Sequence, residues 1–592
     1  MEERTAAVSP FLDAGTFVRF AETAEAIGAT TKRLEKAAIL GRYFAGLGDD
    51  DLLRAARYFA GYAFSLRDQR TTNVGGAALV AAILAVSGAD EARLRERLVA
   101  LGDAGDVAHE AFAASPTQAQ LAPVLTLGDM AGFLETLAAT SGTKRKVELV
   151  TDLLRRAAPL EAKYVVKLLQ GDLRIGLKEG AVEDGIARLA GTDVGRIQWV
   201  NMLTGDIGET ALLARHGRLD TARMRLFHPI KFMLATAAED LSDVARQMPP
   251  EFAVEDKYDG IRAQAHVARA TPGDDILHGV SVEGRHVALF SRTLDEITES
   301  FPDLVGPLAA ALTPERRAAS DEGFILDGEV VPVQGERILP FQELQKRLGR
   351  KTLTEAVLSS VPVAFVAYDV LYADGRVLIN APFAERRAVL EGLSGMGAPL
   401  RVTPSERFSD VAKLDEAFDA ARVRGNEGLM VKDPGSPYKP GRRGRDWLKI
   451  KRALATLDVV VTAAQVGEGR RSRFLSDYTF AVRASETNPT LLNVGKAYSG
   501  LTDVEITRLS EWFRSHALQS FAHGKVITVE PKIVLEVTFD RVQPSTRHKS
   551  GYALRFPRIL RIREDKPVEE IDTLETVRRL AEAGGGAAEA ET

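Results

Sequence analysis

The 592-residue sequence contains no cysteine, and this absence removes several kinds of site. The chain can form no disulfide, no thiolate zinc site and no cysteine nucleophile. Long apolar runs are also missing, since the longest, residues 77–86, is too short to cross a bilayer. Residues 1–4 are acidic and no apolar stretch follows them, so we expect no secretory signal and no membrane partner.

An excess of positive charge is missing as well, because the formal net charge is -5. A nucleic-acid partner is not excluded by this value, since binding depends on where basic residues lie rather than on their sum. Basic residues gather within residues 439–452 and again within residues 541–566. A charged run alone usually forms a solvated face, so these clusters favour nucleic acid only if phosphate chemistry lies nearby.

Length and local patterns predict three folded domains and a tail. Apolar residues at helical spacing dominate residues 1–225, and residues 143–156 illustrate this with a clear amphipathic pattern. Strand and helix patterns alternate over residues 226–453, as in an α+β domain. Residues 454–575 show short strand patterns with one helix, which favours a small β-barrel of the OB type. The remaining residues, 576–592, are predicted to be a disordered tail rich in Gly, Ala and Glu.

One short motif, Lys257-Tyr258-Asp259-Gly260, gives the first indication of chemistry. Apolar and polar residues alternate on both sides of it, so Asp259-Gly260 should turn the chain and leave Lys257 at a strand end. A lysine in such a place is a candidate covalent nucleophile once it has lost its proton. The motif alone is weak, because so short a pattern also arises by chance.

Further charged residues follow in short apolar strands, where a core would not favour them. In chain order these segments are Phe290-Ser291-Arg292, Asp327-Gly328-Glu329, Tyr368-Asp369, Glu427-Gly428 with Lys432, Lys449-Ile450-Lys451, and Arg563-Glu564-Asp565-Lys566. The two-residue period of a strand places Asp327 and Glu329 on one face, where they suit a ribose hydroxyl or a metal ion. Lys432, Lys449 and Lys451 are expected to converge on Lys257 and to neutralise phosphate charge.

This ordered set resembles the signature motifs of the covalent nucleotidyltransferases, and in detail it is similar to that of the ATP-dependent DNA ligases. The resemblance spans about residues 140–570 and is weaker at its front. It implies an all-α DNA-binding domain, an α+β adenylation domain and an OB-fold domain. It also implies that Lys257 attacks the α-phosphate of ATP. The AMP then passes to a 5′-phosphate at a nick in double-stranded DNA, and the adjacent 3′-hydroxyl displaces it.

The resemblance implies roles for individual residues. Glu427 and Glu329 match positions that hold Mg²⁺, with Mn²⁺ as an alternative, and Glu329 also matches a ribose contact. Tyr368 occupies the place of an adenine-stacking aromatic. The other matching positions contact the nucleotide, its phosphates or the DNA 5′-phosphate, and here they are Glu255, Arg262, Arg292, Lys432, Lys449, Lys451, Arg563 and Lys566. Near the front, Leu168 to Leu177, with its glycines and Arg174, is similar to a stretch of the family's DNA-binding domain.

Other classes of function are weighed against this interpretation. An NAD-dependent ligase is disfavoured because that family carries a tetracysteine zinc module. An RNA ligase or a capping enzyme would not need the helical front domain or the Arg555-Phe556-Pro557-Arg558 stretch. A catalytically silent DNA clamp would give no covalent adduct with ATP. The sequence leaves open whether the role is replication, repair or recombination. It also leaves open the preference among ATP, ADP and GTP and the identity of protein partners. We expect a monomer in a prokaryotic cytoplasm, associated with the nucleoid.

Overall fold

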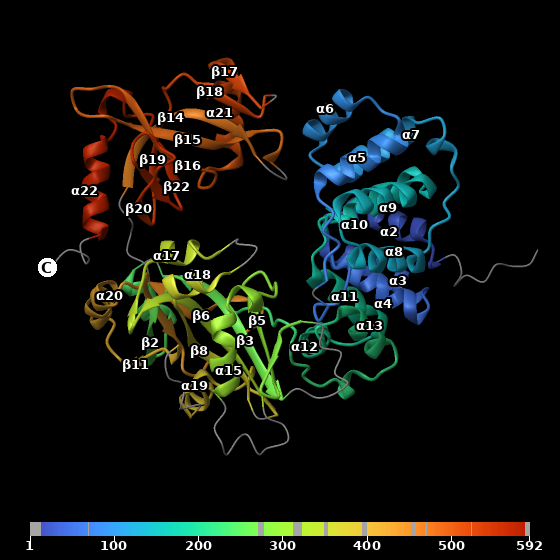
Figure 1. Cartoon of the computed structure of the whole chain (residues 1–592), viewed down its shortest axis with the longest axis horizontal. Coiled ribbons are helices and arrows are strands. Elements are labelled where there is room, and N and C mark those ends of the chain that lie inside the picture. Colours follow the sequence, from blue (N-terminus) through green and yellow to red (C-terminus); the bar gives the residue numbers. More distant parts are fainter. Residues whose placement is uncertain are drawn as a thin grey trace, which may run out of the picture. The chain divides into compact units, whose positions relative to one another are not determined.

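The computed structural model describes residues 14–68, 70–238, 240–269, 278–311, 323–348, 353–373, 375–392, 399–450, 456–467, 471–522 and 524–585. The chain forms two compact units, one of Met1–Leu94 with Ala104–Ile450 and the other of Arg95–Asp103 with Lys451–Thr592. Figure 1 colours these from blue at the start of the chain to red at its end. Within the described residues, no helix is both long enough and apolar enough to pass through a membrane.

The front of the chain is helical, which confirms the prediction for this region. Its helices are α2 (Phe17–Gly28), α3 (Arg33–Ala45), α4 (Asp49–Phe59), α5 (Gly76–Ser87), α6 (Glu91–Leu101), α7 (Ala104–Ala114), α8 (Leu127–Ala139), α9 (Thr143–Arg156), α10 (Pro159–Leu169), α11 (Glu179–Ala190), α12 (Val194–Thr204) and α13 (Ile207–Arg215). α9 covers the residues whose apolar spacing predicted a helix. Side-chain caps begin several helices, as where Thr126 and Asp129 form a capping box at α8.

Two sheets follow within the same unit, and we call this part the two-sheet region. The smaller sheet has the order β1-β13-β12-β2-β11, and the larger runs β10-β8-β6-β3-β5-β4 with β7 on β6 and β9 on β8. The strands are β1 (Leu234–Ala237), β2 (Phe252–Lys257), β3 (Ile261–Arg269), β4 (Val280–Val282), β5 (Arg285–Ser291), β6 (Gly323–Gln334), β7 (Arg337–Ile338), β8 (Val363–Ala373), β9 (Arg376–Val377), β10 (Leu400–Val402), β11 (Ser405–Phe408), β12 (Gly428–Lys432) and β13 (Arg443–Ile450).

Helices accompany these two sheets, and most of them cover the outer faces. They are α14 (Leu241–Gln247), α15 (Pro302–Ala310), α17 (Phe341–Gln345), α18 (Glu355–Ser360), α19 (Phe383–Gly392) and α20 (Lys413–Val423). Leu304 and Leu308 of α15 pack on the larger sheet, where the helix lies across the strands in Figure 1. Phe418 of α20 packs on the smaller sheet. A third cluster, which includes Ile325 and Trp447, joins the inner faces of the two sheets. The region is therefore layered helix, sheet, sheet, helix, with polar positions of the inner faces brought together.

The predicted turn after Lys257 joins the two sheets to each other. β2 ends at Lys257 and β3 begins at Ile261, and the two strands belong to different sheets. Gly260 allows this crossing, because a Cβ atom there would lie 2.3 Å from the carbonyl oxygen of Val330 on β6. Lys257 therefore stands at a strand end, as predicted, at the edge where the sheets face each other.

The second unit is built mainly of strands. They are β14 (Thr456–Val466), β15 (Leu475–Arg483), β16 (Leu491–Ala497), β17 (Ala517–Phe521), β18 (Val526–Val529), β19 (Val534–Thr538), β20 (Arg541–Pro544), β21 (Tyr552–Arg555) and β22 (Arg558–Ile562), with helix α21 (Asp503–Ser515). β14 pairs with β15 on one side, and on the other with β19 along its first half and β18 along its second.

The predicted β-barrel of this unit is not closed by the pairings among the described residues. The sheet order is β16-β15-β14-β18-β17, with β19 on β14 and β22 on β19, so β16, β17 and β22 remain edges. Because β14 divides its second side between two partners, the sheet branches rather than forming a ring. A partly open barrel is compatible with an OB-fold.

The predicted tail needs a correction over its first part. Residues 576–585 lie in helix α22 (Leu574–Gly585) instead of being disordered. The helix forms because Val577 is buried in the core of the second unit, with Leu574 and Leu580 packed against that core. Residues 586–592 lie outside the described residues, as does the predicted boundary between 453 and 454.

Candidate active site

Lys257 and Glu427 meet at the inner edge of the smaller sheet. β2 and β12 are antiparallel neighbours, with Lys257 opposite Gly428. The Glu427 backbone N–H donates to the Lys257 carbonyl oxygen at 2.7 Å. The Lys257 ammonium in turn contacts the Glu427 carboxylate. Two predicted site residues that are far apart in sequence are thus brought together by strand pairing.

Glu329 approaches the same place from β6 of the larger sheet. Its side chain is half-buried, and burial raises its pKa to about 7. Lys257 and Arg262 lower this pKa, whereas the negative charges of Glu427 and Asp327 raise it further. Glu329 is therefore a carboxylate whose charge is incompletely compensated by the protein, next to Lys257.

The half-buried Arg262 and the buried Asp327 form an ion pair on neighbouring strands. The guanidinium donates from Nε at 3.1 Å and from Nη2 at 2.7 Å to the two Asp327 oxygens, and from Nη1 to the Met233 carbonyl oxygen at 2.8 Å. The Tyr438 hydroxyl donates to Asp327 at 2.8 Å. Burial lowers the pKa of Arg262, but the charge and hydrogen bonds of Asp327, together with the nearby Tyr368 and Tyr438, hold this pKa well above its usual value. Asp327, which we expected to face a ribose or a metal ion, is already engaged by these two side chains.

Lys432 and Glu255 pair with each other in the interior. Lys432 Nζ lies 2.6 Å from Glu255 Oε2 and donates to the Tyr368 carbonyl oxygen at 3.2 Å. The ammonium also lies 4.4 Å from the ring centre of Trp447 and 5.1 Å from that of Tyr368. Both side chains are buried. Lys432 was expected to converge on Lys257. It is held instead by Glu255, which lies two residues before Lys257 on β2, because a buried ammonium requires a partner.

The other predicted positions differ in what surrounds them. Lys449 pairs with Met430 in the strand register, which places it on the face that carries Lys257. Tyr368 is half-buried on β8, with its ring centre 5.6 Å from the Arg262 guanidinium. Arg292 is exposed directly after β5. Lys451 lies outside the described residues.

Arg563 and Lys566 belong to the second unit and share one carboxylate there. Arg563 Nη1 donates to Asp458 Oδ2 at 2.9 Å, and Lys566 Nζ donates to the same oxygen at 2.7 Å. Arg563 also pairs with Asp565 at 2.9 Å. The first strand of the unit therefore holds both basic residues of the last motif through Asp458.

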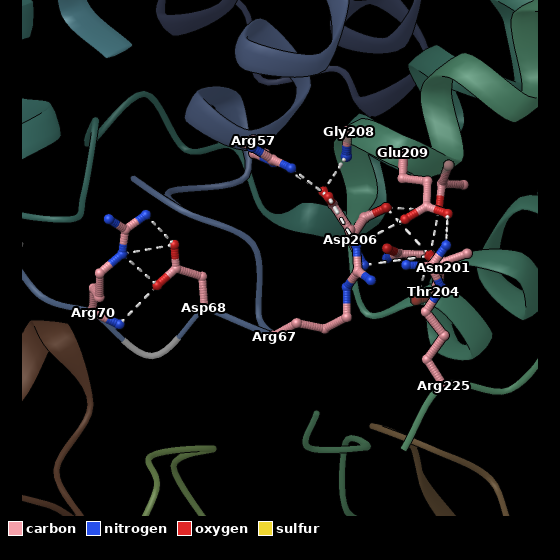
Figure 2. A network of polar contacts seen from close by, with 11 residues as sticks. Arg57, Arg67, Asp68, Arg70, Asn201, Thr204, Asp206, Gly208, Glu209 and Arg225 are labelled. Atoms are coloured by element: carbon pink, nitrogen blue, oxygen red, sulfur yellow. Dashed lines mark hydrogen bonds and ion pairs between the residues drawn. The ribbon is translucent and has the colours of Figure 1, made fainter. Parts of the chain in front are cut away.

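The helical front holds a polar network of arginines and carboxylates, shown in Figure 2. Asp206 accepts a hydrogen bond from Arg57 Nε at 2.9 Å and caps α13 through the Gly208 N–H at 2.9 Å. Glu209 lies 2.9 Å from Arg67 and 2.7 Å from Arg225. These ion pairs thus connect α4 and the loop after it with the start of α13 and with the segment that follows the helices.

The glycine-rich stretch predicted to approach DNA is braced by a lysine that the sequence analysis did not identify. The ammonium of Lys36, which is buried, donates to the carbonyl oxygens of Ile175 at 2.7 Å and Gly176 at 2.9 Å. Arg174 within the loop has a positive φ of 52°. Tyr438 of the Arg262 pair was likewise not identified, because an aromatic in a loop carries no periodic signal.

Three family profiles match the chain in order. They are described as "DNA ligase N terminus" over residues 16–187, "ATP dependent DNA ligase domain" over residues 232–451 and "ATP dependent DNA ligase C terminal region" over residues 471–566. A protein of Koribacter versatilis named "Probable DNA ligase" is 46% identical over 584 residues, which cover 95% of this chain and 96% of that protein. A DNA ligase of Archaeoglobus fulgidus is 33% identical over 571 residues, which cover 95% and 98%.

A solved structure supports the same arrangement of secondary structure. The structure named Pmar-Lig_PreS3 covers 92% of this chain and 99% of its own, with a TM-score of 0.57 and 15% sequence identity. At that identity the likeness concerns the fold alone.

Proposed function

Since the chain belongs to the ATP-dependent DNA ligase family, it is an enzyme that uses ATP to join DNA, and we propose that Lys257 is the residue on which AMP is carried. One observation supports this assignment above the others. Lys257 stands at the end of β2 with its ammonium on Glu427, while Glu329 and Arg262 approach from the facing sheet. A nucleophile, two carboxylates and a guanidinium at one edge suit transfer of a phosphoryl-linked nucleotide.

In the proposed reaction, Lys257 loses a proton and its Nζ attacks the α-phosphorus of ATP. A nitrogen–phosphorus bond forms as the bond to the β-phosphate oxygen breaks, and pyrophosphate leaves. A DNA 5′-phosphate oxygen then attacks the phosphorus of the lysyl-AMP, the nitrogen–phosphorus bond breaks to release Lys257 as the amine, and the AMP is left on the DNA end. Finally the adjacent 3′-hydroxyl attacks the activated 5′-phosphate, and AMP departs as the phosphodiester forms. Each step is an in-line displacement that depends on positioning and on neutralising charge.

Glu427 and Glu329 are the residues we propose for holding Mg²⁺, or Mn²⁺ in its place. Two carboxylates beside Lys257 match the oxygen ligands that these ions prefer, and the incompletely compensated charge of Glu329 fits a cation. When bound, the ion supplies positive charge to the α-phosphate as the displacement proceeds. Within the part of the chain that the structure describes, no three His, Cys, Asp or Glu side chains gather into a fuller site, so phosphate and water would complete the coordination.

The remaining predicted residues are assigned to the nucleotide and the DNA. We assign adenine stacking to the half-buried Tyr368, and α-phosphate contact to Lys449 and Lys451. Glu255 with Lys432 forms the buried floor of the nucleotide site, and Arg262 its wall beside Glu329. Arg292, being exposed, is assigned to a DNA phosphate, and Arg563 with Lys566 to pyrophosphate.

The substrate we propose is a nick in duplex DNA, bound by a monomer. Joining such nicks serves replication, repair and recombination. The helical front contributes sequence-independent contacts, for which the loop of Gly171 and Arg174 offers backbone amides and a guanidinium. A cytoplasmic location follows from this substrate.

The test is incubation with Mg²⁺ and ATP labelled at the α-phosphate, followed by denaturing electrophoresis. Wild type should acquire the label and Lys257→Ala should not, while Lys346→Ala, a change of an exposed lysine in the same unit, should behave as wild type. The labelled protein should then lose its label to nicked duplex DNA but not to intact duplex. Label on Lys257→Ala would refute the assignment, and no label on pyrophosphate-treated wild type would favour a silent clamp.

A further inference from the structure

Asp256, the residue before Lys257, is held from outside the active site by three hydrogen bonds. Arg424 donates to its two carboxylate oxygens, from Nε at 2.7 Å and from Nη2 at 2.7 Å. The Asn426 side-chain amide donates to Asp256 Oδ2 at 2.8 Å. Because side chains alternate along a strand, Asp256 points away from the face that carries Lys257. It is therefore tightly bound without facing the nucleotide site.

The residues that hold Asp256 form the end of α20. The N–H of Gly425 donates to the carbonyl oxygen of Arg422 at 2.9 Å, and the N–H of Asn426 donates to that of Ala421 at 3.0 Å. Gly425 has a positive φ of 85°. This pair of bonds with a left-handed glycine is a Schellman motif, which fixes the direction in which the chain leaves the helix. Arg424 and Asn426 thus have a set backbone geometry before they reach Asp256.

Glu427 follows this helix end directly. Its N–H donates to the Lys257 carbonyl oxygen at 2.7 Å, and its carboxylate contacts the Lys257 ammonium. Two consecutive residues of β2, Asp256 and Lys257, are therefore tied to one short segment, through Asp256 on the outer face and Lys257 on the inner. A shift of either segment would change where the Glu427 carboxylate lies relative to Nζ.

We infer that Asp256, held by Arg424 and Asn426, is a positioning residue that fixes Lys257 and Glu427 relative to each other for the transfer of AMP. The inference rests on the proposed function of Lys257. Asp256 contacts neither the lysine ammonium nor the face on which ATP binds, so its effect passes through the backbone of β2 and the helix end. A displacement of about 1 Å in a reacting group can slow a reaction by on the order of 100-fold.

If the Asp256–Arg424 pair had a purely structural role, its loss would lower the free energy of unfolding. The Arg424 side chain is 55% exposed, and ion pairs of such exposure contribute little to the free energy of unfolding. Loss of the pair should therefore leave the protein folded. If its function is positioning, the loss appears instead in the rate of one chemical step.

The experiment measures single-turnover self-adenylation of the full chain for Asp256→Asn, Arg424→Gln, Asn426→Ala and the Asp256→Asn/Arg424→Gln double variant. At saturating ATP we expect the rate to fall about 10-fold to 100-fold in each single variant, with the KM for ATP changed less than about threefold. The double variant should be no slower than the slower single one, because both remove the same interaction. Arg424→Lys, which keeps the charge but not the planar fork, should lie between.

Two controls make the result specific. Arg376→Gln removes a surface pair with Glu385, 2.8 Å long, from the same unit and should adenylate as wild type. Thermal unfolding of every variant should match wild type. Should Asp256→Asn fail to fold, Asn426→Ala carries the test, since it leaves the Arg424 pair in place.

Several outcomes would overturn the inference. These are wild-type adenylation rates in the variants, a rise in KM alone, or additive losses in the double variant. Lys257→Ala is measured alongside, and label on that variant would refute the proposed function itself. An unlabelled Lys257→Ala together with fully active Asp256 and Arg424 variants would refute only the positioning role.

Discussion

Replacement of Glu329 by glutamine should stabilise the folded protein at alkaline pH even though it removes a proposed metal ligand. Burial raises the pKa of Glu329 to about 7, and the negative charge of Glu427 adds to the effect. Above that pH the folded state therefore holds an ionised carboxylate in an environment that favours the protonated form. Glutamine keeps the shape of the side chain and removes the charge.

The sign and size of the effect follow from proton binding by Glu329. Between its ordinary pKa of 4.5 and about 7, the folded state binds a proton that the unfolded chain has lost. Stability contributed by this group is thus full below pH 4.5 and falls as the pH rises toward 7. The stability lost between pH 4.5 and a pH well above 7 is about 3 kcal/mol at most, because the side chain is only half-buried. From pH 5.5 to 8.5, the advantage of Glu329→Gln should grow by about 2 kcal/mol.

Urea unfolding followed by tryptophan fluorescence measures this difference. Trp199 and Trp447 lie in the first unit, and a Trp512→Phe background removes the signal of the second. Glu336→Gln, a change of an exposed carboxylate just after β6, is the matched control and should show no gain with pH. If the free energies of unfolding of wild type and Glu329→Gln changed with pH in parallel, burial would not raise the pKa of this carboxylate.

Three further predictions concern stability. Asp327→Ala leaves the half-buried Arg262 without its counter-charge and should lower the free energy of unfolding by about 3 kcal/mol, measured by urea unfolding. Gly260→Ala puts a Cβ atom 2.3 Å from the Val330 carbonyl oxygen and should lower the thermal midpoint of the first unit, whereas Gly306→Ala, at an exposed position of α15 with no atom near the added Cβ, should not. Burial lowers the pKa of His228 to about 4, so wild type should lose about 3 kcal/mol as the pH falls from 6.5 to 4, and His228→Gln should lose correspondingly less.

Local features of this protein could be predicted from the sequence because they depend on near neighbours. The helix over residues 143–156 follows from apolar spacing, and the end of β2 at Lys257 from alternation interrupted by Asp259-Gly260. Alternation also predicted that Lys449 and Lys451 share a strand face, and this stays a prediction because Lys451 lies outside the described residues. The order of the motifs likewise indicated the family before any residue was placed in space.

Which charged side chains pair with each other was decided only by the tertiary structure. Lys432 pairs with Glu255 rather than converging on Lys257, and Arg262 pairs with Asp327. Strand register brings these opposite charges together. A buried charge must be compensated by whatever opposite charge the packing places beside it, and sequence spacing does not encode that neighbour.

The same reason explains two further features that the sequence does not reveal. Asp256 and Arg424 are 168 residues apart and meet only because α20 packs against the strand that carries Lys257. Residues 576–585 are helical because the core of the second unit offers an apolar surface for Val577 and Leu580. The sequence by itself determined which groups are available for adenylate chemistry. The long-range packing of two sheets decided which of them face one another.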